Sequence, residues 1–326
     1  MTIDAPQISD IAAAVRARRT LAREVIDEAL SRISRYQEQF HLFTAVLPEL
    51  ALEQAKNVDA RILSGEDLPL AGVTFAVKDL IDVAGTPTTR GSRAFAQHKA
   101  DADATVVKKL VDAGAVLLGK LNMHECAYGF TGENPDFGDC PNPWNTELIA
   151  GGSSSGSAAA VSLGVCAFTL GTDTGGSIRM PASLCGVTGI KPTYGRVSRA
   201  GVAPLCWSMD HVGPLARTAA EAADVLQAMS GADPRDETAS GRGVPDYAAE
   251  LAQDIRGLRI GVPREWFFDS LQIDVAEAVN GAIDRLVALG AKRVKVSLPH
   301  LPEVLGAHRA ILLSEAATAY EAQLRD

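Results

Sequence analysis

Apolar residues recur along the chain at spacings typical of helices in some stretches and of strands in others. From Leu21 to Ile33 they return every three or four positions with charged residues between them, which is the period of a helix that covers a core. By contrast, Val73–Val77 is a short, largely apolar run, as expected for a buried strand. Helices that alternate with short strands predict an α/β sandwich with a largely parallel sheet.

One combination of helix, glycine and strand occurs twice. The first copy covers residues 104–118 with Gly114 at the break, and the second covers residues 274–296 with Gly290 at the break. A glycine directly after the last helical residue is a common helix stop, because glycine adopts the left-handed backbone conformation without strain. Both copies therefore predict a helix that turns sharply into a strand.

Two pairs of residues have the spacing of a helix capping box, in which a short polar side chain precedes an acidic one by three positions. Thr218 and Glu221 form such a pair ahead of a helix that runs through Met229, and Asp274 and Glu277 form the second. Both pairs predict the start of a helix.

The segment Ser230–Pro245 is polar and rich in glycine and proline, which predicts a long surface loop. A strand pattern resumes at Leu258–Val262. We therefore expect one domain over residues 1–326, with this loop inside it.

Composition and charge exclude several classes of protein. Hydrophobic residues make up 47% and charged residues 22% of the chain, which is the balance of a globular protein and excludes a disordered one. The net charge of −9 is spread along the chain, so there is no global attraction to nucleic acid or to anionic membranes. Neither is expected as a partner.

The run Leu148–Thr172 carries no charged residue and is long enough to span a bilayer. Its glycine- and serine-rich backbone would be left without hydrogen-bond partners in lipid, so we interpret the run as buried interior of a cytoplasmic protein. The cysteines have no metal-type spacing and are expected to be reduced thiols, mostly buried; they are Cys126, Cys140, Cys166, Cys185 and Cys206.

The segment 151–183, GGSSSGSAAAVSLGVCAFTLGTDTGGSIRMPAS, is the most informative part of the chain. A flexible linker is disfavoured because the serines run directly into apolar sequence. A phosphate-binding loop would need lysine where Ser157 stands. A nucleophile elbow at Gly152–Gly156 would need a strand before it and a histidine base, and no histidine has a distinguishing context.

A fourth interpretation uses the Gly-Gly-Ser sequence that occurs twice, ending at Ser153 and at Ser177. Glycines ahead of a serine let bare backbone N–H groups approach a substrate oxygen, as an oxyanion hole requires. A buried, neutral lysine can activate a serine, and Lys78 at the end of an apolar strand has a suitable position. Taken alone, the two serines fit helix caps or turns better than a catalytic role, and Lys78 fits an ordinary solvated lysine better than a base.

These segments together resemble the amidase signature family of Ser–cis-Ser–Lys hydrolases. The resemblance implies an α/β amidase signature fold, with a mixed, mostly parallel central sheet covered by helices on both faces. It also implies a small-molecule amide substrate and no metal or organic cofactor. The segments that carry it, in chain order, are PLAGVTFAVKDLIDVAGTPTTRGS (69–92), DATVVKKLVDAGAVLLGKLNMHE (103–125), GGSSSGSAAAV (151–161), GTDTGGSIRMPASLCGVTGIKPTYGRVSRAG (171–201) and SMDHVGPLART (208–218).

The resemblance also assigns roles to residues by their position in these motifs. It implies that Ser177 is the nucleophile, that Ser153, following a cis peptide bond, is the bridging serine, and that Lys78 is the general base. The oxyanion hole would be formed by the backbone N–H groups of Thr174, Gly175, Gly176 and Ser177.

Several neighbours of these residues are expected to have structural roles. Asp173 and Arg179 are expected to form an ion pair that holds the loop. Ser154 and Ser155 are expected to hydrogen-bond to the backbone. The segment Asn122–His124 fits either a pocket wall or a packed loop.

The expected reaction is hydrolysis of a linear carboxylic acid amide to a carboxylate and ammonia or an amine. Met180 and His211 stand where the glutaminase subunit of the tRNA-dependent amidotransferase usually has glutamine, so the sequence favours the general amidase branch. The glutaminase subunit of that amidotransferase is the alternative. Family members continue beyond the equivalent of Asp326 with strands of the same sheet that line the pocket. A chain that lacks this portion could instead be a truncated, non-catalytic fragment.

The sequence names neither the amide substrate nor the oligomeric state. A homodimer is one arrangement compatible with it.

Overall fold

The computed structural model describes residues 6–97 and 99–322. Contacts within the chain divide it into two compact units, Met1–Ala248 and Ala249–Asp326. The single domain expected over residues 1–326 stays a prediction, and each unit is described by itself.

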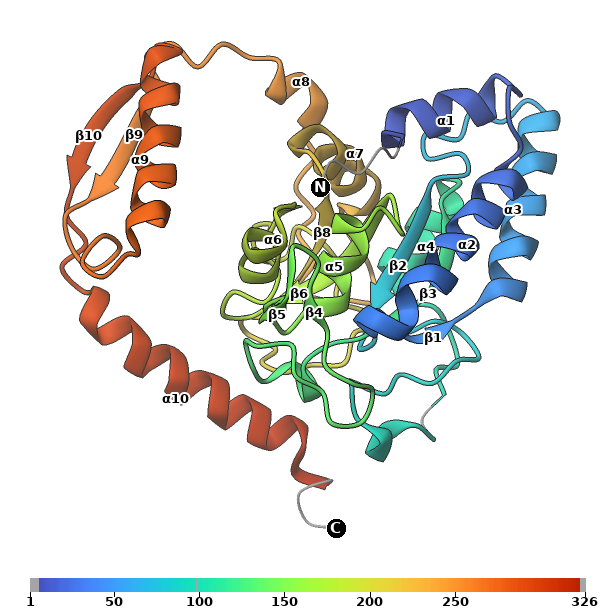
Figure 1. Ribbon diagram of the computed structural model, residues 1–326, viewed down its shortest axis with the longest axis horizontal. Helices are drawn as coiled ribbons and strands as arrows, with labels where there is room; N and C mark the ends of the chain where they lie inside the picture. The colour runs from blue at the N-terminus through green and yellow to red at the C-terminus, as the bar shows by residue number, and fades with distance from the viewer. Residues whose placement is uncertain (1–5, 98, 323–326) are drawn as a thin grey trace. The chain divides into compact units, whose positions relative to one another are not determined.

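The first unit contains most of the helices and strands (Figure 1). Its helices are α1 (Ile8–Arg16), α2 (Ala22–Phe40), α3 (Pro48–Leu63), α4 (Thr105–Asp112), α5 (Ser155–Ser162), α6 (Arg179–Cys185) and α7 (Ala219–Met229), and α8 (Tyr247–Leu251) crosses the boundary between the units. Its strands are β1 (Phe43–Val46), β2 (Thr74–Lys78), β3 (Val116–Leu121), β4 (Pro141–Asn142), β5 (Asn145–Ile149), β6 (Phe168–Asp173), β7 (Thr188–Gly189) and β8 (His211–Ala216). Short 3-10 turns lie at Arg93–Phe95 and Glu125–Ala127.

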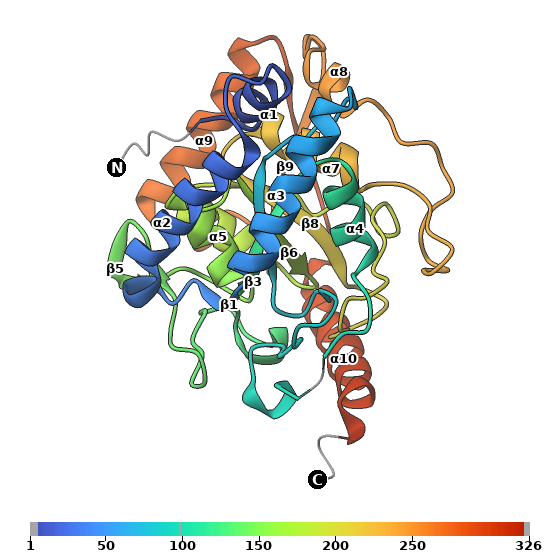
Figure 2. The ribbon, with the colours of Figure 1, turned by 90° about the vertical axis from the view of Figure 1, so that its right-hand side faces the viewer.

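Six of these strands form one sheet in the order β1-β3-β2-β6-β8-β7. Strand β2 runs parallel to both β3 and β6, whereas β1 and β8 run antiparallel to their partners β3 and β6. Helices α2 and α5 lie on one face of the sheet and α4 and α7 on the other (Figure 2). Strand β7 is antiparallel to β8, so β2, β3, β6 and β7 all point in one direction. The expected mixed, mostly parallel sheet with helices on both faces is therefore confirmed.

Strand β2 shows why Lys78 faces the first of these helix layers. Ala76 packs into the core shared with α2 and α5, whereas the ring of Phe75 stacks on Phe168 of β6 with ring centroids 5.3 Å apart. Successive side chains of a strand point to opposite faces, so Lys78 lies on the same face as Ala76. The sequence of β2 thus directs the lysine toward the start of α5.

Helix α5 is buried along nearly its whole length, which confirms that the uncharged run forms interior from residue 150 onward. At Gly156 a side chain would place its Cβ 2.5 Å from the carbonyl oxygen of Leu42, so only glycine allows this close approach. Within the part of the chain that the structure describes, no helix is both long and apolar enough to cross a membrane. The exposed β5 precedes this buried segment.

The two predicted capping pairs have different outcomes. Thr218 caps α7, with its hydroxyl accepting from the Glu221 N–H at 3.2 Å while its own N–H donates to the Glu221 carboxylate at 3.1 Å, so this prediction is confirmed. The prediction for Asp274 is wrong, because the helix begins at Ile273 with Gln272 before it and no side-chain cap. Asp274 lies inside the first turn instead.

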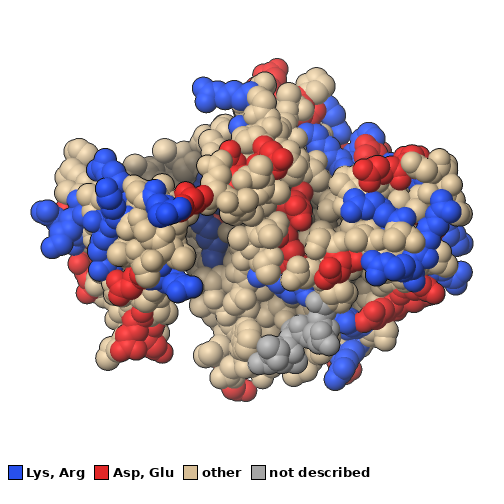
Figure 3. Space-filling view, turned by 90° about the horizontal axis from the view of Figure 1, so that it is seen from above, with Lys and Arg blue, Asp and Glu red and all other residues tan. Residues whose placement is uncertain are grey.

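The second unit contains β9 (Arg259–Pro263), α9 (Ile273–Ala288), β10 (Lys292–Val296) and α10 (Leu301–Ala319). Strands β9 and β10 pair in parallel, with α9 between them in the sequence. Gly290, with φ of 103°, makes the predicted turn from α9 into β10. In the space-filling view of Figure 3, patches of acidic and basic side chains are separated by wide areas of other residues.

Candidate active site

The amine of Lys78 lies between two hydroxyl groups at the end of β2. Its Nζ is 2.7 Å from the Oγ of Ser153 and donates to the Oγ1 of Thr172 at 2.9 Å. Lys78 and Ser153 have no exposed surface, and Thr172 is 5% exposed. The fold therefore brings together three side chains from β2, from the segment before α5 and from β6.

The environment of Lys78 lowers its pKa from 10.5 to about 7. Burial is the largest cause, because it disfavours the ammonium form, and the negative charges of Asp173 and Asp210 offset part of the shift. At neutral pH a substantial fraction of Lys78 is a neutral amine, which can accept a proton.

Ser153 is held by the backbone around it. The Gly152–Ser153 peptide bond is cis. The carbonyl oxygen of Ser153 accepts a hydrogen bond from the N–H of His124 at 3.1 Å. Gly152 packs so closely on the 129–132 loop that an added Cβ would lie 3.0 Å from the N of Gly132.

Ser177 is connected to Ser153 through Ser154, the next residue along the chain. The N–H of Ser154 donates to the carbonyl oxygen of Ser177 at 3.2 Å, and the Oγ of Ser154 donates to the carbonyl of Thr172. The two Gly-Gly-Ser segments, far apart in the sequence, are thus joined side by side. Ser177 is 5% exposed.

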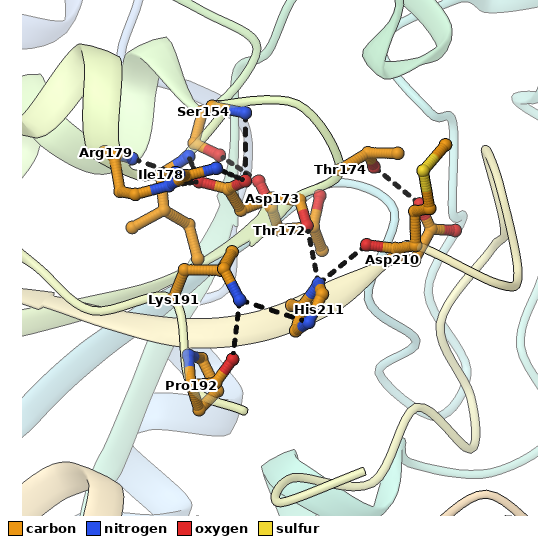
Figure 4. Close-up of polar contacts among 12 residues, drawn as sticks. Ser154, Thr172, Asp173, Thr174, Ile178, Arg179, Lys191, Pro192, Asp210 and His211 are labelled. Atoms are coloured by element: carbon orange, nitrogen blue, oxygen red, sulfur yellow. Dashed lines mark hydrogen bonds and ion pairs between the residues drawn. The ribbon is translucent and has the colours of Figure 1, made fainter. Parts of the chain in front are cut away.

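The loop that carries Ser177 is held by the carboxylate of Asp173 (Figure 4). Arg179 donates to both carboxylate oxygens, at 2.9 and 2.8 Å, and the N–H groups of Gly176 and Ile178 donate at 2.9 and 3.1 Å. Burial alone would raise the pKa of Asp173, but the hydrogen bonds and charge of Arg179 together with the backbone N–H bonds lower it overall. Asp173 and Arg179 therefore form the predicted ion pair.

The N–H groups predicted for the oxyanion hole differ in their hydrogen bonds. The N–H of Gly176 is engaged by Asp173, whereas in the described residues the structure gives the N–H groups of Gly175 and Ser177 no hydrogen-bond partner. The space beside Gly176 is open, since an added Cβ would meet no atom within 4 Å. The hydroxyl of Thr174 donates to Asp210 at 2.5 Å.

Of the remaining predictions near the site, some are confirmed and one is wrong. The serine hydroxyls differ: Ser154 bonds to the backbone as predicted, but the buried Oγ of Ser155 has no partner among the described atoms, so that prediction is wrong. Asn122 and Met123 are buried, and the Asn122 amide donates to the carbonyls of His41 and Gly138, as in a packed loop.

The cysteines are free thiols, and all but the half-buried Cys126 are buried, as expected. Burial raises the pKa of the Cys140, Cys166 and Cys185 thiols, which keeps them protonated. Among the described residues, no group of three or more histidine, cysteine, aspartate or glutamate side chains is arranged to hold a metal ion.

Sequence reasoning missed three residues that stabilise the site. Thr172 stands two positions from Thr174 in the TDT sequence, but nothing in that pattern distinguishes which threonine contacts the lysine. Asp79, directly after Lys78, forms a fully buried ion pair with Lys120 at 3.0 Å. Lys78 and Lys120 lie near the ends of β2 and β3. The Asp79–Lys120 pair could be predicted only once these two strands were known to be neighbours.

For the amide hydrolysis that the sequence resemblance leads us to expect, replacing Thr172 by valine should lower kcat/KM about tenfold, the usual effect of losing one buried hydrogen bond. The bond to Thr172 is stronger for the ammonium than for the amine, so its loss also moves the acid limb of the pH profile to lower pH. Ammonia release measured against pH tests both effects, with the exposed Thr146→Val as control. An unchanged rate and an unchanged limb would show that Thr172 does not orient Lys78.

Fold and site together define the class: an α/β protein in which a buried lysine contacts a serine that follows a cis peptide bond. A family model described as Amidase matches residues 24–326. The chain belongs to this family, the amidase signature enzymes, as the sequence resemblance predicted.

Individual relatives are similar over nearly the whole chain. The A subunit of glutamyl-tRNA(Gln) amidotransferase from Roseiflexus sp. (strain RS-1) is 48% identical over 294 residues, which cover 90% of this chain and 60% of that protein. A protein solved in a vestigial complex that bears on the origins of an s-triazine catabolic enzyme is 43% identical, with a TM-score of 0.93, over 98% of this chain and 70% of that one. Native peptide amidase from Stenotrophomonas maltophilia is 34% identical, with a TM-score of 0.89, over 97% and 67%.

The chain therefore spans only about 60% of the length of the amidotransferase A subunit that it matches.

Proposed function

We propose that the chain hydrolyses an amide C–N bond through Lys78, Ser153 and Ser177. The observation that carries the proposal is the buried amine of Lys78, with a pKa of about 7, at 2.7 Å from the Oγ of Ser153. A neutral amine in that place can take the proton of a serine hydroxyl, which an ammonium cannot do.

The proposed reaction has two steps. Lys78 takes the proton of Ser153 as Ser153 takes that of Ser177, and the Oγ of Ser177 attacks the amide carbonyl. The tetrahedral oxyanion accepts hydrogen bonds from the N–H groups of Gly175 and Ser177, the C–N bond breaks, and the proton returns through Ser153 to the leaving amine. Water then attacks the acyl-enzyme, with the same relay taking its proton, and releases the carboxylate.

Two kinds of observation bear on which amide is cleaved. Relatives that are 45–48% identical are named as the A subunit of glutamyl-tRNA(Gln) amidotransferase, which supports glutamine as the amide and makes the amidotransferase alternative the better supported activity. Met180 and His211, and the likeness to peptide amidase, support a general amidase instead. We propose glutamine as the substrate to be tested first.

The test is ammonia release by the whole chain from glutamine, asparagine, a short aliphatic amide and an aryl amide at equal concentration. We expect glutamine to have the highest kcat/KM. A clear preference for the aliphatic or aryl amide would overturn the glutaminase assignment and leave amide hydrolysis standing. No turnover of any amide, together with no labelling of Ser177 by a fluorophosphonate probe, would contradict both.

A further inference from the structure

A second group of polar side chains lies next to Asp173, the first residue of the loop that carries Ser177, at the start of β8 (Figure 4). The Nδ1 of His211 lies 2.6 Å from the carbonyl oxygen of Met209 and 3.2 Å from that of Asp173. Its Nε2 lies 3.2 Å from the Nζ of Lys191, which also donates to the carbonyl of Pro192 at 2.9 Å. The ring is half-buried, and the ring of Tyr194 meets it edge-on at 5.6 Å.

These contacts define one protonation state of the imidazole. Both neighbours of Nδ1 are carbonyl oxygens, which only accept, so Nδ1 carries the hydrogen. The neighbour of Nε2 is an ammonium, which only donates, so Nε2 carries the lone pair. His211 is therefore neutral in this arrangement, with each ring nitrogen engaged.

The contact with Asp173 connects this imidazole to the proposed catalytic loop. Asp173 pairs with His211 in the β6–β8 register, and its carboxylate holds Gly176 and Arg179. Asp173, the first residue of the loop, is thus held at two places. Arg179 binds its carboxylate, and His211 binds its backbone carbonyl. Asp173, which His211 contacts, stands four positions before Ser177 in the chain.

The charges around the imidazole determine what a second proton does to it. Lys191 faces Nε2, and the positive charge of Arg179 is already opposed by the carboxylate of Asp173. The carboxylate of Asp210 is engaged by Thr174 and by the backbone N–H groups of Leu205 and Cys206. Arg199 lines the same pocket as His211.

Protonation of His211 would place two positive charges 3.2 Å apart and remove the acceptor of the Lys191 hydrogen bond. Consistent with this, burial first and the charge of Lys191 second lower the pKa of His211 below its usual value of 6.5.

We propose that His211 and Lys191 act as a pair that positions the Ser177 loop. The hydrogen bond between them exists only while His211 is neutral. The proposal rests on the proposed function, because its consequence is read in amide hydrolysis. Two groups must then be deprotonated before the reaction proceeds: Lys78, as the base, and His211, as a member of the pair. Below the His211 pKa both groups are protonated, so log kcat/KM rises with pH at a slope greater than 1, and at a slope of 1 between the two pKa values.

The decisive variant is His211→Gln. A glutamine amide can donate to the carbonyls and accept from Lys191 but does not titrate. We expect kcat/KM at pH 8 within about threefold of wild type, and an acid limb whose slope stays near 1, as for a single titrating base. His211→Ala leaves the carbonyls and Lys191 without a partner, and we expect kcat to fall about tenfold at pH 8 and by a smaller factor below the His211 pKa, where the wild-type pair is also broken. The exposed His300→Gln is the matched control.

An acid slope in His211→Gln equal to that of wild type, or a His211→Ala variant with wild-type kcat, would overturn the proposal. Nitrogen-15 NMR of the imidazole gives a readout that is independent of activity. We expect the Nδ1–H tautomer in wild type, and a higher pKa of His211 in Lys191→Met, since a neighbouring cation has been removed. An unchanged pKa in that variant would refute the pair.

The NMR result also separates this proposal from the proposed function. If the wild-type chain shows no Ser177-dependent turnover, the proposed function fails, while the tautomer and the pKa in Lys191→Met still decide whether the pair exists.

Discussion

Replacing Ser177 by alanine is expected to lower kcat/KM for amide hydrolysis by about 10⁴-fold or more, because the acyl-enzyme cannot form without the attacking hydroxyl. The same variant should no longer react with a fluorophosphonate probe, which mass spectrometry of the labelled peptide detects. Labelling is the more general of the two measurements, since it requires a formed site but no knowledge of the substrate.

Ser183→Ala is the matched control, because Ser183 is an exposed serine on α6 only six positions further along the chain. It should keep wild-type activity and wild-type labelling. Ammonia release by Ser177→Ala at the wild-type rate would remove Ser177 from the mechanism, whatever the result with the probe.

Replacing Lys78 by methionine is expected to lower kcat/KM by about 10⁴-fold as well, since the relay then lacks its base. Wild-type kcat/KM should rise with pH through about 7 and be level above it, because Lys78 acts as a base only when it is neutral and its pKa is about 7. A lysine in water would place this limb at about pH 10.4. The position of the limb therefore reports the burial of Lys78 directly.

Thermal unfolding separates this loss of activity from misfolding. The folded pKa of Lys78 lies below the unfolded one, so between about 7 and 10.5 the unfolded chain binds more protons and the stability of wild type rises with pH. Lys78→Met lacks this contribution and is expected to gain stability relative to wild type at pH 6, with a smaller gain at pH 9. The exposed Lys56→Met is the control.

Two results would contradict the assignment of Lys78 as the base. One is substantial activity in Lys78→Met at pH 8. The other is a wild-type acid limb near pH 10, which would mean that the lysine is solvated in the working protein.

Much of the fold followed from local sequence. The 3.6-residue period marked α2, the glycine at position 114 marked the turn from α4 into β3, and the Thr218 box marked the start of α7. Each of these signals depends on residues within one or two helical turns of each other, so it survives without knowledge of the rest of the chain. The failed cap at Asp274 shows the limit, since one extra helical residue before it changes its position from cap to first turn.

The candidate site was only partly readable in the same way. The repeated Gly-Gly-Ser sequence and the strand that ends at Lys78 were enough to single out Ser153, Ser177 and the lysine, and the family resemblance gave them roles. Those roles stay predictions until the substitutions are measured. Thr172 and the Lys191–His211 pair were not assigned by that reasoning, because their partners lie 94 and 20 positions away in the chain.

By itself, then, the sequence determined several of the helices, the strand that ends at Lys78, and which family the chain belongs to. Only the tertiary structure decided that Lys78 is a buried amine with a pKa of about 7, and that Asp173 engages the N–H of Gly176. The physical reason is that periodicity and capping are properties of neighbouring residues. Desolvation and the pairing of buried polar groups depend instead on β2, β6 and the start of α5 packing around the same point.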